Sequence, residues 1–261
     1  MSIAIITGAS SGMGAEFVKQ LKLQYGVNDF WLVARRSEKM EQIAKELEVN
    51  AKIICADLTA SEGIEKIREL LATERPSVKY LINSAGFGNF GAFDQVPESD
   101  AAKMIDLNVK ALVLITHMVI PYMERGGRIV ELGSGSCFTP LPYFNVYASS
   151  KSFVLHYTKG LNPEIRKYGI RATCFCPGWV ETEFIDKATE RAEVTAPKKM
   201  SPMLSCEKVV SGCVKSLKRG PVMYVTNWYT KMQHVLFKLV PDCILTKLWL
   251  GMQKHPDGYE K

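Results

Sequence analysis

Short apolar runs alternate with longer segments of helical periodicity along the whole chain. The short runs lack the apolar–polar alternation of a half-exposed strand, which is typical of strands covered by helices on both faces. Strands that regularly alternate with helices indicate right-handed βαβ units and a mostly parallel sheet. The predicted strands are 3–7, 30–34, 52–55, 80–83, 128–132, 171–176 and 222–225.

The intervening segments predict helices, and together the elements indicate one doubly wound α/β domain over residues 1–261. We expect one irregularity, because Asn162-Pro163 resembles a cap and first-turn proline and predicts a kink or restart in its helix. The predicted helices are 13–25, 38–47, 62–72, 99–124, 146–168 and 207–217.

The stretch TGASSGMG at positions 7–14 follows the first predicted strand directly. In that place Gly8 allows a tight exit from the strand, Gly12 lets a ligand approach the backbone, and Gly14 lets the helix lie close to the sheet. The helix N-terminus then presents free N–H groups to a pyrophosphate. The loop residues expected to contact a dinucleotide are Gly8, Ser10, Ser11, Gly12, Met13 and Gly14.

The residues after the second predicted strand distinguish NADP from NAD. An acidic side chain there would bind the free ribose hydroxyls of NAD, but this chain has Arg35 and Arg36. Two guanidinium groups suit the 2′-phosphate of NADP, so NADP(H) is expected in preference to NAD. Asp57 and Leu58 follow the third strand, where they either meet the adenine edge or cap the next turn.

Tyr147 and Lys151 lie four positions apart in VYASSK, on one face of a predicted helix. A phenol is a poor base at neutral pH, and a nearby cation stabilises its phenolate and lowers its pKa. This pair therefore suits general acid–base work on a carbonyl or alcohol oxygen.

Two further polar residues are candidates for the same site. Ser134 stands thirteen positions before Tyr147 at the end of the fifth strand, where its hydroxyl could hold the substrate oxygen; Ser136 is the competing choice. Asn108 is polar within an apolar helical face, where it could bond a backbone carbonyl and anchor a water that relays protons to Lys151.

With these motifs in order, the chain resembles a short-chain dehydrogenase/reductase. The resemblance also rests on NSAG at 83–86 and PGWVET at 177–182, and it covers roughly residues 1–185. It implies a Rossmann-type fold and NAD(P)-dependent oxidoreduction, with Tyr147 as proton donor, Ser134 holding the substrate oxygen, Lys151 on the nicotinamide ribose and Asn108 anchoring the relay. Arg35 falls where NAD-preferring relatives carry an acid. The further cofactor contacts that the resemblance implies are Asn83, Ala85, Gly86, Pro177, Gly178, Val180 and Thr182.

Composition excludes other classes of function. The net charge of +6 comes without a basic stripe, which argues against nucleic acid. Cys174 and Cys176 are expected to be buried reduced thiols on one face of a strand, with no metal site. The chain shows no signal peptide and no apolar run of the roughly 20 residues that a membrane-spanning helix needs, so a cytoplasmic protein is expected. No His/Asp pair or GxSxG supports a hydrolase.

The C-terminal third suggests how a substrate is enclosed. A polar stretch at about 185–205 falls where relatives form a lid over the substrate, so the resemblance implies a lid; a surface loop is the alternative. Residues at about 228–254 predict two short amphipathic helices separated by Pro241, which pack on the core or cap the substrate entrance, join subunits, or lie on a membrane surface.

We therefore expect an oxidoreductase that interconverts a ketone and a secondary alcohol on a bulky apolar, hydroxysteroid-like or lipid-derived substrate. The alternatives are a catalytically silent NADP(H)-binding regulatory protein and a reductase of acyl or other small carbonyl compounds. Relatives usually pair through two long helices, here predicted at 99–124 and 146–168, so a homodimer or homotetramer is expected.

Overall fold

The computed structural model describes residues 2–190, 196–197, 200 and 202–253. Within these residues the centre is a seven-stranded sheet in the order β3-β2-β1-β4-β5-β6-β7, and each strand pairs in parallel with its neighbours. This confirms the predicted doubly wound parallel sheet. The strands are β1 (Ser2–Thr7), β2 (Asp29–Ala34), β3 (Asn50–Cys55), β4 (Ser77–Asn83), β5 (Met123–Leu132), β6 (Arg171–Cys176) and β7 (Met223–Val225).

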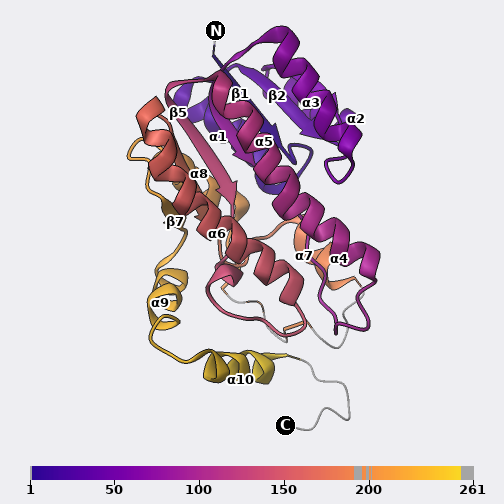
Figure 1. Ribbon diagram of the computed structural model, residues 1–261, viewed down its shortest axis with the longest axis vertical. Coiled ribbons are helices and arrows are strands. Elements are labelled where there is room, and N and C mark those ends of the chain that lie inside the picture. The colour runs from indigo at the N-terminus through magenta and orange to yellow at the C-terminus, as the bar shows by residue number, and fades with distance from the viewer. Residues whose placement is uncertain (1, 191–195, 198–199, 201, 254–261) are drawn as a thin grey trace.

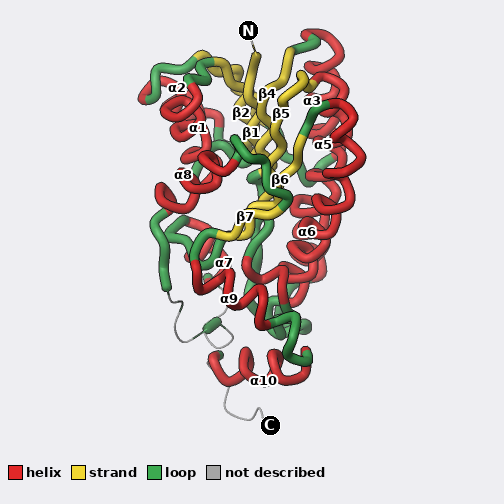
Figure 2. The backbone as a smooth tube through the Cα atoms, turned by 90° about the vertical axis from the view of Figure 1, so that its left-hand side faces the viewer, coloured by secondary structure: helices red, strands yellow, loops and turns green. Residues whose placement is uncertain are grey.

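Helices cover both faces of the sheet: α1, α2 and α8 lie on one side, and α3, α5 and α6 on the other (Figure 2). Successive residues of β1 point to opposite faces of the sheet. Ile6 packs in the core beneath α1 and α8, and Ile5 packs in the core beneath α3 and α5. The helices are α1 (Gly12–Tyr25), α2 (Ser37–Glu46), α3 (Ser61–Glu74), α4 (Glu98–Ile105), α5 (Leu112–Val119), α6 (Asn145–Ile165), α7 (Glu183–Thr189), α8 (Cys206–Ser216), α9 (Trp228–Leu236) and α10 (Asp242–Met252).

The strand order reverses between β1 and β4, so the βα loops diverge at that point and open a crevice beyond the carboxyl ends of the strands. The segments α7, α9 and α10 lie at this end of the sheet (Figures 1 and 2). The fold therefore places α7, where the predicted lid begins, and the two tail helices at the end of the sheet that carries the glycine loop (Figures 1 and 2).

Helix α4 continues into α5 through a π-helical stretch, Asp106–Ala111, which contains Asn108. By length and hydropathy the whole helical run Glu98–Tyr122 could cross a membrane. Ile115 and Val119 of this run pack in the core against residues of β1 and β4. The apolar face of the helix is therefore explained by its packing on the sheet.

Two predicted boundaries are wrong. The helix predicted to reach residue 124 ends at Tyr122, and β5 begins at Met123, because Pro121 lies in a single 3₁₀ turn after which the backbone becomes extended. Helix α6 does not restart at Pro163 but runs through it to Ile165. Because Pro163 has no N–H, the carbonyl of Lys159 lacks its helical partner in the last turn. Asn162 does not cap a new helix, and its side-chain oxygen instead accepts a bond from the Ala172 N–H at the start of β6.

The tail forms the two predicted helices, but they pack differently. Leu245 and Trp249 of α10 are buried, and the Trp249 indole donates to the Pro142 carbonyl at 2.9 Å. The apolar stripe of α9 faces outward instead, with Trp228 73% exposed and the following Leu239 78% exposed. The expected packing on the body of the protein thus holds for α10 and is wrong for the apolar face of α9.

Candidate active site

The glycine loop between β1 and α1 has the conformation of a phosphate cradle. Gly8 and Gly12 adopt left-handed φ values of +67° and +53°, which favour glycine. A Cβ on Gly8 would lie 2.8 Å from the Ala85 backbone, and one on Gly14 would lie 2.7 Å from the carbonyl carbon of Gly8. Ser11 makes no side-chain cap to α1, which leaves first-turn N–H groups for a ligand. These features fit a dinucleotide pyrophosphate.

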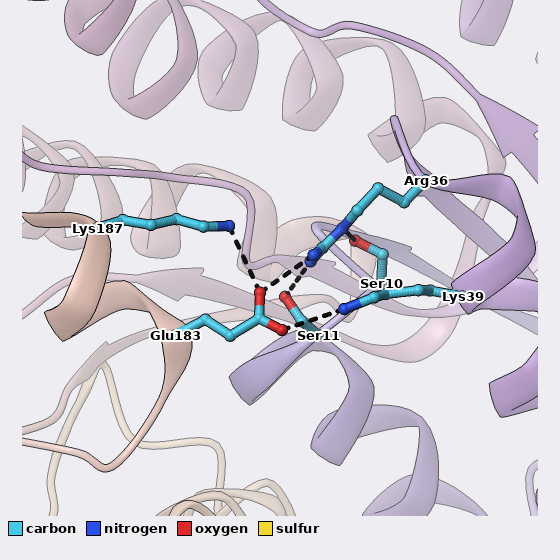
Figure 3. Close-up of polar contacts among 6 residues, drawn as sticks. All are labelled: Ser10, Ser11, Arg36, Lys39, Glu183 and Lys187. Atoms are coloured by element: carbon cyan, nitrogen blue, oxygen red, sulfur yellow. Dashed lines mark hydrogen bonds and ion pairs between the residues drawn. The ribbon is translucent and has the colours of Figure 1, made fainter. Parts of the chain in front are cut away.

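Arg36, and not Arg35, extends over the glycine loop. Its Nε donates to Ser10 Oγ at 3.3 Å and its Nη2 to Ser11 Oγ at 2.6 Å, whereas Arg35 is exposed (Figure 3). The sequence offered both arginines to the 2′-phosphate, and the resemblance placed Arg35 at the position of the acid in NAD-preferring relatives. Only the backbone direction after β2 separates them, because consecutive residues point to different sides.

Two residues of this cluster were missed by sequence analysis. Glu183, at the start of α7, accepts bonds from Arg36 Nη1 at 3.1 Å and Lys39 Nζ at 3.2 Å (Figure 3). Lys39 could have been found, because it follows Arg36 by three positions at the start of a helix. Nothing in the sequence around Glu183 indicates its contact with Arg36, because the two residues are 147 positions apart.

Asp57 caps the turn after β3. Its Oδ1 accepts from the Thr59 N–H at 2.9 Å and the Thr59 hydroxyl at 2.8 Å, and the backbone bond chiefly lowers the pKa of this carboxyl. Leu58 is buried. Of the two roles predicted for Asp57, the structure shows the capping of the turn, because its carboxylate accepts both bonds from Thr59.

The NSAG segment after β4 brings backbone close to the centre of the site. The Ala85 N–H donates to Thr7 Oγ1 at 3.2 Å, and a Cβ on Gly86 would lie 2.9 Å from Asn108 Oδ1. The side chain of Asn83 points into the core, where its Nδ2 donates to Thr116 and Glu131. Gly88 was not predicted, and a Cβ there would lie 2.6 Å from the ring of Tyr147.

Ser134, Tyr147 and Lys151 come together at the carboxyl end of β5. Ser134 is placed to donate a hydrogen bond to the Tyr147 oxygen, which lowers the pKa of the phenol. Lys151 is 2% exposed, and its Nζ donates to the Leu132 carbonyl at 2.7 Å and lies 5.6 Å from the centre of the Tyr147 ring. The competing Ser136 makes no such contact; its hydroxyl is buried without a partner among the described residues. The spacing argument thus selected the serine that contacts Tyr147.

Asn108 ties two parts of the site together. Its side chain bonds both backbone groups of Phe87, at 3.1 Å to the N–H and 2.9 Å to the carbonyl, and donates to the Ser150 hydroxyl at 3.1 Å. The amide therefore joins the NSAG loop to α6. The π-helical stretch positions it, and such stretches recur at functional sites.

The electrostatics differ from the sequence expectation for Tyr147. Burial raises the pKa of its phenol, and the hydrogen bond with Ser134 only partly opposes this. Burial also lowers the pKa of Lys151 to about 8, against the opposing effects of neighbouring thiols and Glu131. In the protein alone the phenol therefore holds its proton firmly, and the expected lowering of its pKa by Lys151 does not dominate.

Aromatic side chains surround Tyr147. The ring of Phe144 stacks on it at 4.4 Å between centroids, Phe184 lies at 5.3 Å, and Phe90 stacks on Phe144 at 3.8 Å. Trp249 of α10 belongs to the same buried cluster. The polar groups of the site therefore face a water-poor apolar environment.

The segment after β6 forms the opposite wall of the crevice. Pro177 accepts a bond from the Gly135 N–H at 2.7 Å, the Gly178 N–H donates to Thr226, and Val180 pairs with Leu204. Thr182 faces Gly12, where a Cβ would lie 3.5 Å from its side chain. The predicted lid at 185–205 begins in α7, and its residues 191–195, 198–199 and 201 lie outside the described part of the chain.

Glu131 is an unpredicted buried carboxyl on β5. It accepts bonds from Thr116 Oγ1 at 2.8 Å and Asn83 Nδ2 at 3.0 Å. Burial raises its pKa from 4.5 to about 7. In the sequence Glu131 is a single acidic residue within an apolar strand. A glutamate that faces solvent would look the same, so the sequence could not indicate that it is buried.

Glu131→Gln should change how stability depends on pH. The folded chain retains a proton that the unfolded chain loses between pH 4.5 and about 7, so wild-type stability falls as pH rises through that window. The fall is up to about 3 kcal/mol at ~1.4 kcal/mol per pKa unit. Urea unfolding of the variant at several pH values should lose that slope, whereas Glu69→Gln on the exposed face of α3 should keep it. An unchanged slope in Glu131→Gln contradicts the assignment.

Cys174 and Cys176 are buried, as predicted, and both are free thiols in the structure. The described residues contain no group of three or more His, Cys, Asp or Glu side chains that could hold a metal ion.

Comparison with known proteins agrees with this geometry. A family model described as short chain dehydrogenase matches residues 2–193. Sulfoacetaldehyde reductase 2 of Chromohalobacter salexigens is 34% identical over 70% of this chain and 74% of its own length. The 17-beta-hydroxysteroid dehydrogenase type 3 of Mus musculus is 30% identical over 74% of this chain and 65% of its own. A short-chain dehydrogenase from Sphingobium yanoikuyae, solved with NADPH, superposes with a TM-score of 0.78 at 25% identity and covers 94% of this chain and 95% of its own.

Proposed function

The chain belongs to the short-chain dehydrogenase family and is a nicotinamide-dependent oxidoreductase, and from that premise we propose that it is an NADPH-dependent reductase of a bulky apolar ketone. The reverse reaction is oxidation of the secondary alcohol. The observation that carries the proposal is the Tyr147–Ser134 hydroxyl pair, buried among aromatic rings with Lys151 one helical turn away.

The adenosine end of the crevice supports NADP(H). Arg36 bonds Ser10 and Ser11 of the glycine loop, and Lys39 shares the Glu183 carboxylate with Arg36. No acidic side chain stands at position 35 or 36 to accept from a free ribose hydroxyl. A 2′-phosphate would gain charge-assisted hydrogen bonds there. Gly8, Gly12 and Gly14 would hold the pyrophosphate, and Lys151 the nicotinamide ribose.

Reduced nicotinamide supplies a hydride to the substrate carbon. Ser134 donates a hydrogen bond to the substrate oxygen and holds it beside the Tyr147 hydroxyl, which gives up its proton to that oxygen. A phenol whose pKa is raised by burial is protonated before the reaction, which suits the direction of reduction. Lys151 stabilises the phenolate that is left, and Asn108 keeps the surrounding backbone in place.

The surroundings of Tyr147 support an apolar substrate. Phe144, Phe184, Phe90 and Trp249 offer ring faces and no charge, so removing apolar substrate surface from water against them is favourable. A hydroxysteroid-like ketone fits this chemistry, and a hydroxysteroid dehydrogenase is among the relatives of the chain.

A panel of carbonyl compounds followed at the nicotinamide absorbance tests the proposal. We expect NADPH-dependent reduction of steroid or other bulky apolar ketones, and slower turnover of small charged aldehydes and of any substrate with NADH. The reductive rate should fall as pH rises through about 8, because Lys151 then loses its charge. NADPH binding without turnover on any member of the panel would favour the silent regulatory alternative, and a preference for small carbonyl compounds would overturn the substrate class.

A further inference from the structure

The carboxylate of Glu183 bridges the two walls of the cofactor crevice. Glu183 follows Thr182 at the start of α7, whereas Arg36 and Lys39 belong to the β2–α2 side. Its two oxygens are divided between the cations, Oε2 with Arg36 and Oε1 with Lys39 (Figure 3). Lys187, one turn along α7, also reaches Oε2 at 3.4 Å. The segment that opens the predicted lid is thereby held to the adenosine end of the site.

This bridge uses the donors that a phosphate would need. Arg36 directs Nε to Ser10, Nη2 to Ser11 and Nη1 to Glu183, so each of its three nitrogens already has a partner. Arginine binds phosphate best through two parallel N–H groups. A phosphate that binds Arg36 Nη1 and Lys39 Nζ together would take the place of the Glu183 carboxylate, which now accepts from both.

The bridge is also weak enough to be displaced. The side chains of Arg36, Lys39 and Glu183 are 37%, 48% and 45% exposed, and exposed ion pairs contribute little to stability. Hydrogen bonds from Lys39 and Arg36 lower the pKa of Glu183 to about 2, so the carboxylate is ionised throughout the neutral range. A phosphate monoester carries more charge, about −1.5 to −2 at neutral pH, and offers three acceptor oxygens.

We propose that Glu183 is an internal competitor for the 2′-phosphate of the cofactor, and that binding of this phosphate releases α7 from the glycine-loop side of the crevice. The inference rests on the proposed use of NADP(H). Glu183 then sets how strongly the protein discriminates between cofactors with and without the phosphate. Because linkage is reciprocal, whatever holds α7 in its bridged position weakens NADPH binding by the same factor.

Glu183→Gln tests this by direct binding. The amide keeps the size of the side chain and removes its charge, so NADPH should bind about 10-fold more tightly by isothermal titration calorimetry, while NADH affinity should change less than about 2-fold. The matched control is Glu207→Gln, which removes a similarly exposed carboxylate paired with Lys19 at 3.8 Å and should change neither affinity. Amide hydrogen exchange gives a second readout: residues 183–189 should exchange faster in Glu183→Gln, and in wild type with NADPH but not with NADH.

The outcomes separate this inference from the proposed function. Weaker NADPH binding by Glu183→Gln would overturn the inference, because Glu183 would then hold Arg36 and Lys39 in place for the cofactor. An equal change for NADH would overturn it as well, since the effect would not involve the phosphate. A wild-type protein that binds NADH more tightly than NADPH would refute the cofactor preference alone, and a selective NADPH gain in Glu183→Gln would still support the competition.

Discussion

Tyr147→Phe should reduce ketone turnover by about 10³-fold, within the 10²–10⁴-fold range of general acid catalysis. The substitution removes one hydroxyl, the group that bonds Ser134 and would protonate the substrate oxygen. The ring remains among Phe144 and Phe184, so the fold and the affinity for NADPH should stay close to those of wild type. Single-turnover kinetics with NADPH and a responsive ketone measure the change, and calorimetric titration measures cofactor affinity.

Tyr168→Phe is the matched control for this prediction. Tyr168 lies just beyond the same helix and is 53% exposed, so loss of its hydroxyl should leave turnover unchanged. Retained turnover in Tyr147→Phe would show that another group supplies the proton. Parallel loss of cofactor binding would show instead that the hydroxyl acts in cofactor binding and not in the chemical step.

Gly14→Ala should weaken both the fold and the cofactor site. The added methyl would press on the carbonyl group of Gly8, and these are backbone atoms that cannot rotate away. Overpacking of this kind costs about 1–3 kcal/mol. The loop must move to relieve it, so we expect a melting temperature lower by several degrees and NADPH affinity lower by at least about 10-fold.

Gly160→Ala in α6 should not destabilise the protein, in contrast to Gly14→Ala. No atom outside the local helix lies within 4 Å of a Cβ placed there, and Ala is favoured over Gly in a helix by about 1 kcal/mol. The melting temperature should stay constant or rise, with unchanged NADPH affinity. Equal behaviour of the two variants would show that the close approach of α1 to the glycine loop is not required.

Much of the fold could be predicted because its signals are local. The alternation of apolar runs and helical segments predicts the order of strands and helices, and glycines directly after the first strand indicate a phosphate loop. The spacing of Tyr147, Lys151 and Ser134 predicts a shared site, and the structure brings these three together. Predictions became inaccurate where a local signal had a second explanation. Pro163 was read as a helix start, yet the last turn of α6 accommodates it.

The sequence by itself determined the succession of elements, the glycine loop after the first strand, and the spacing that brings Ser134, Tyr147 and Lys151 together. Each of these depends on neighbours within a few turns of chain. Only the tertiary structure decided which arginine reaches the glycine loop, that Glu131 is buried at the end of a core strand, that the apolar stripe of α9 faces outward, and that Glu183 bridges the crevice. These features depend on groups brought together across the sheet from distant positions, and no periodicity or spacing in the chain records such an approach.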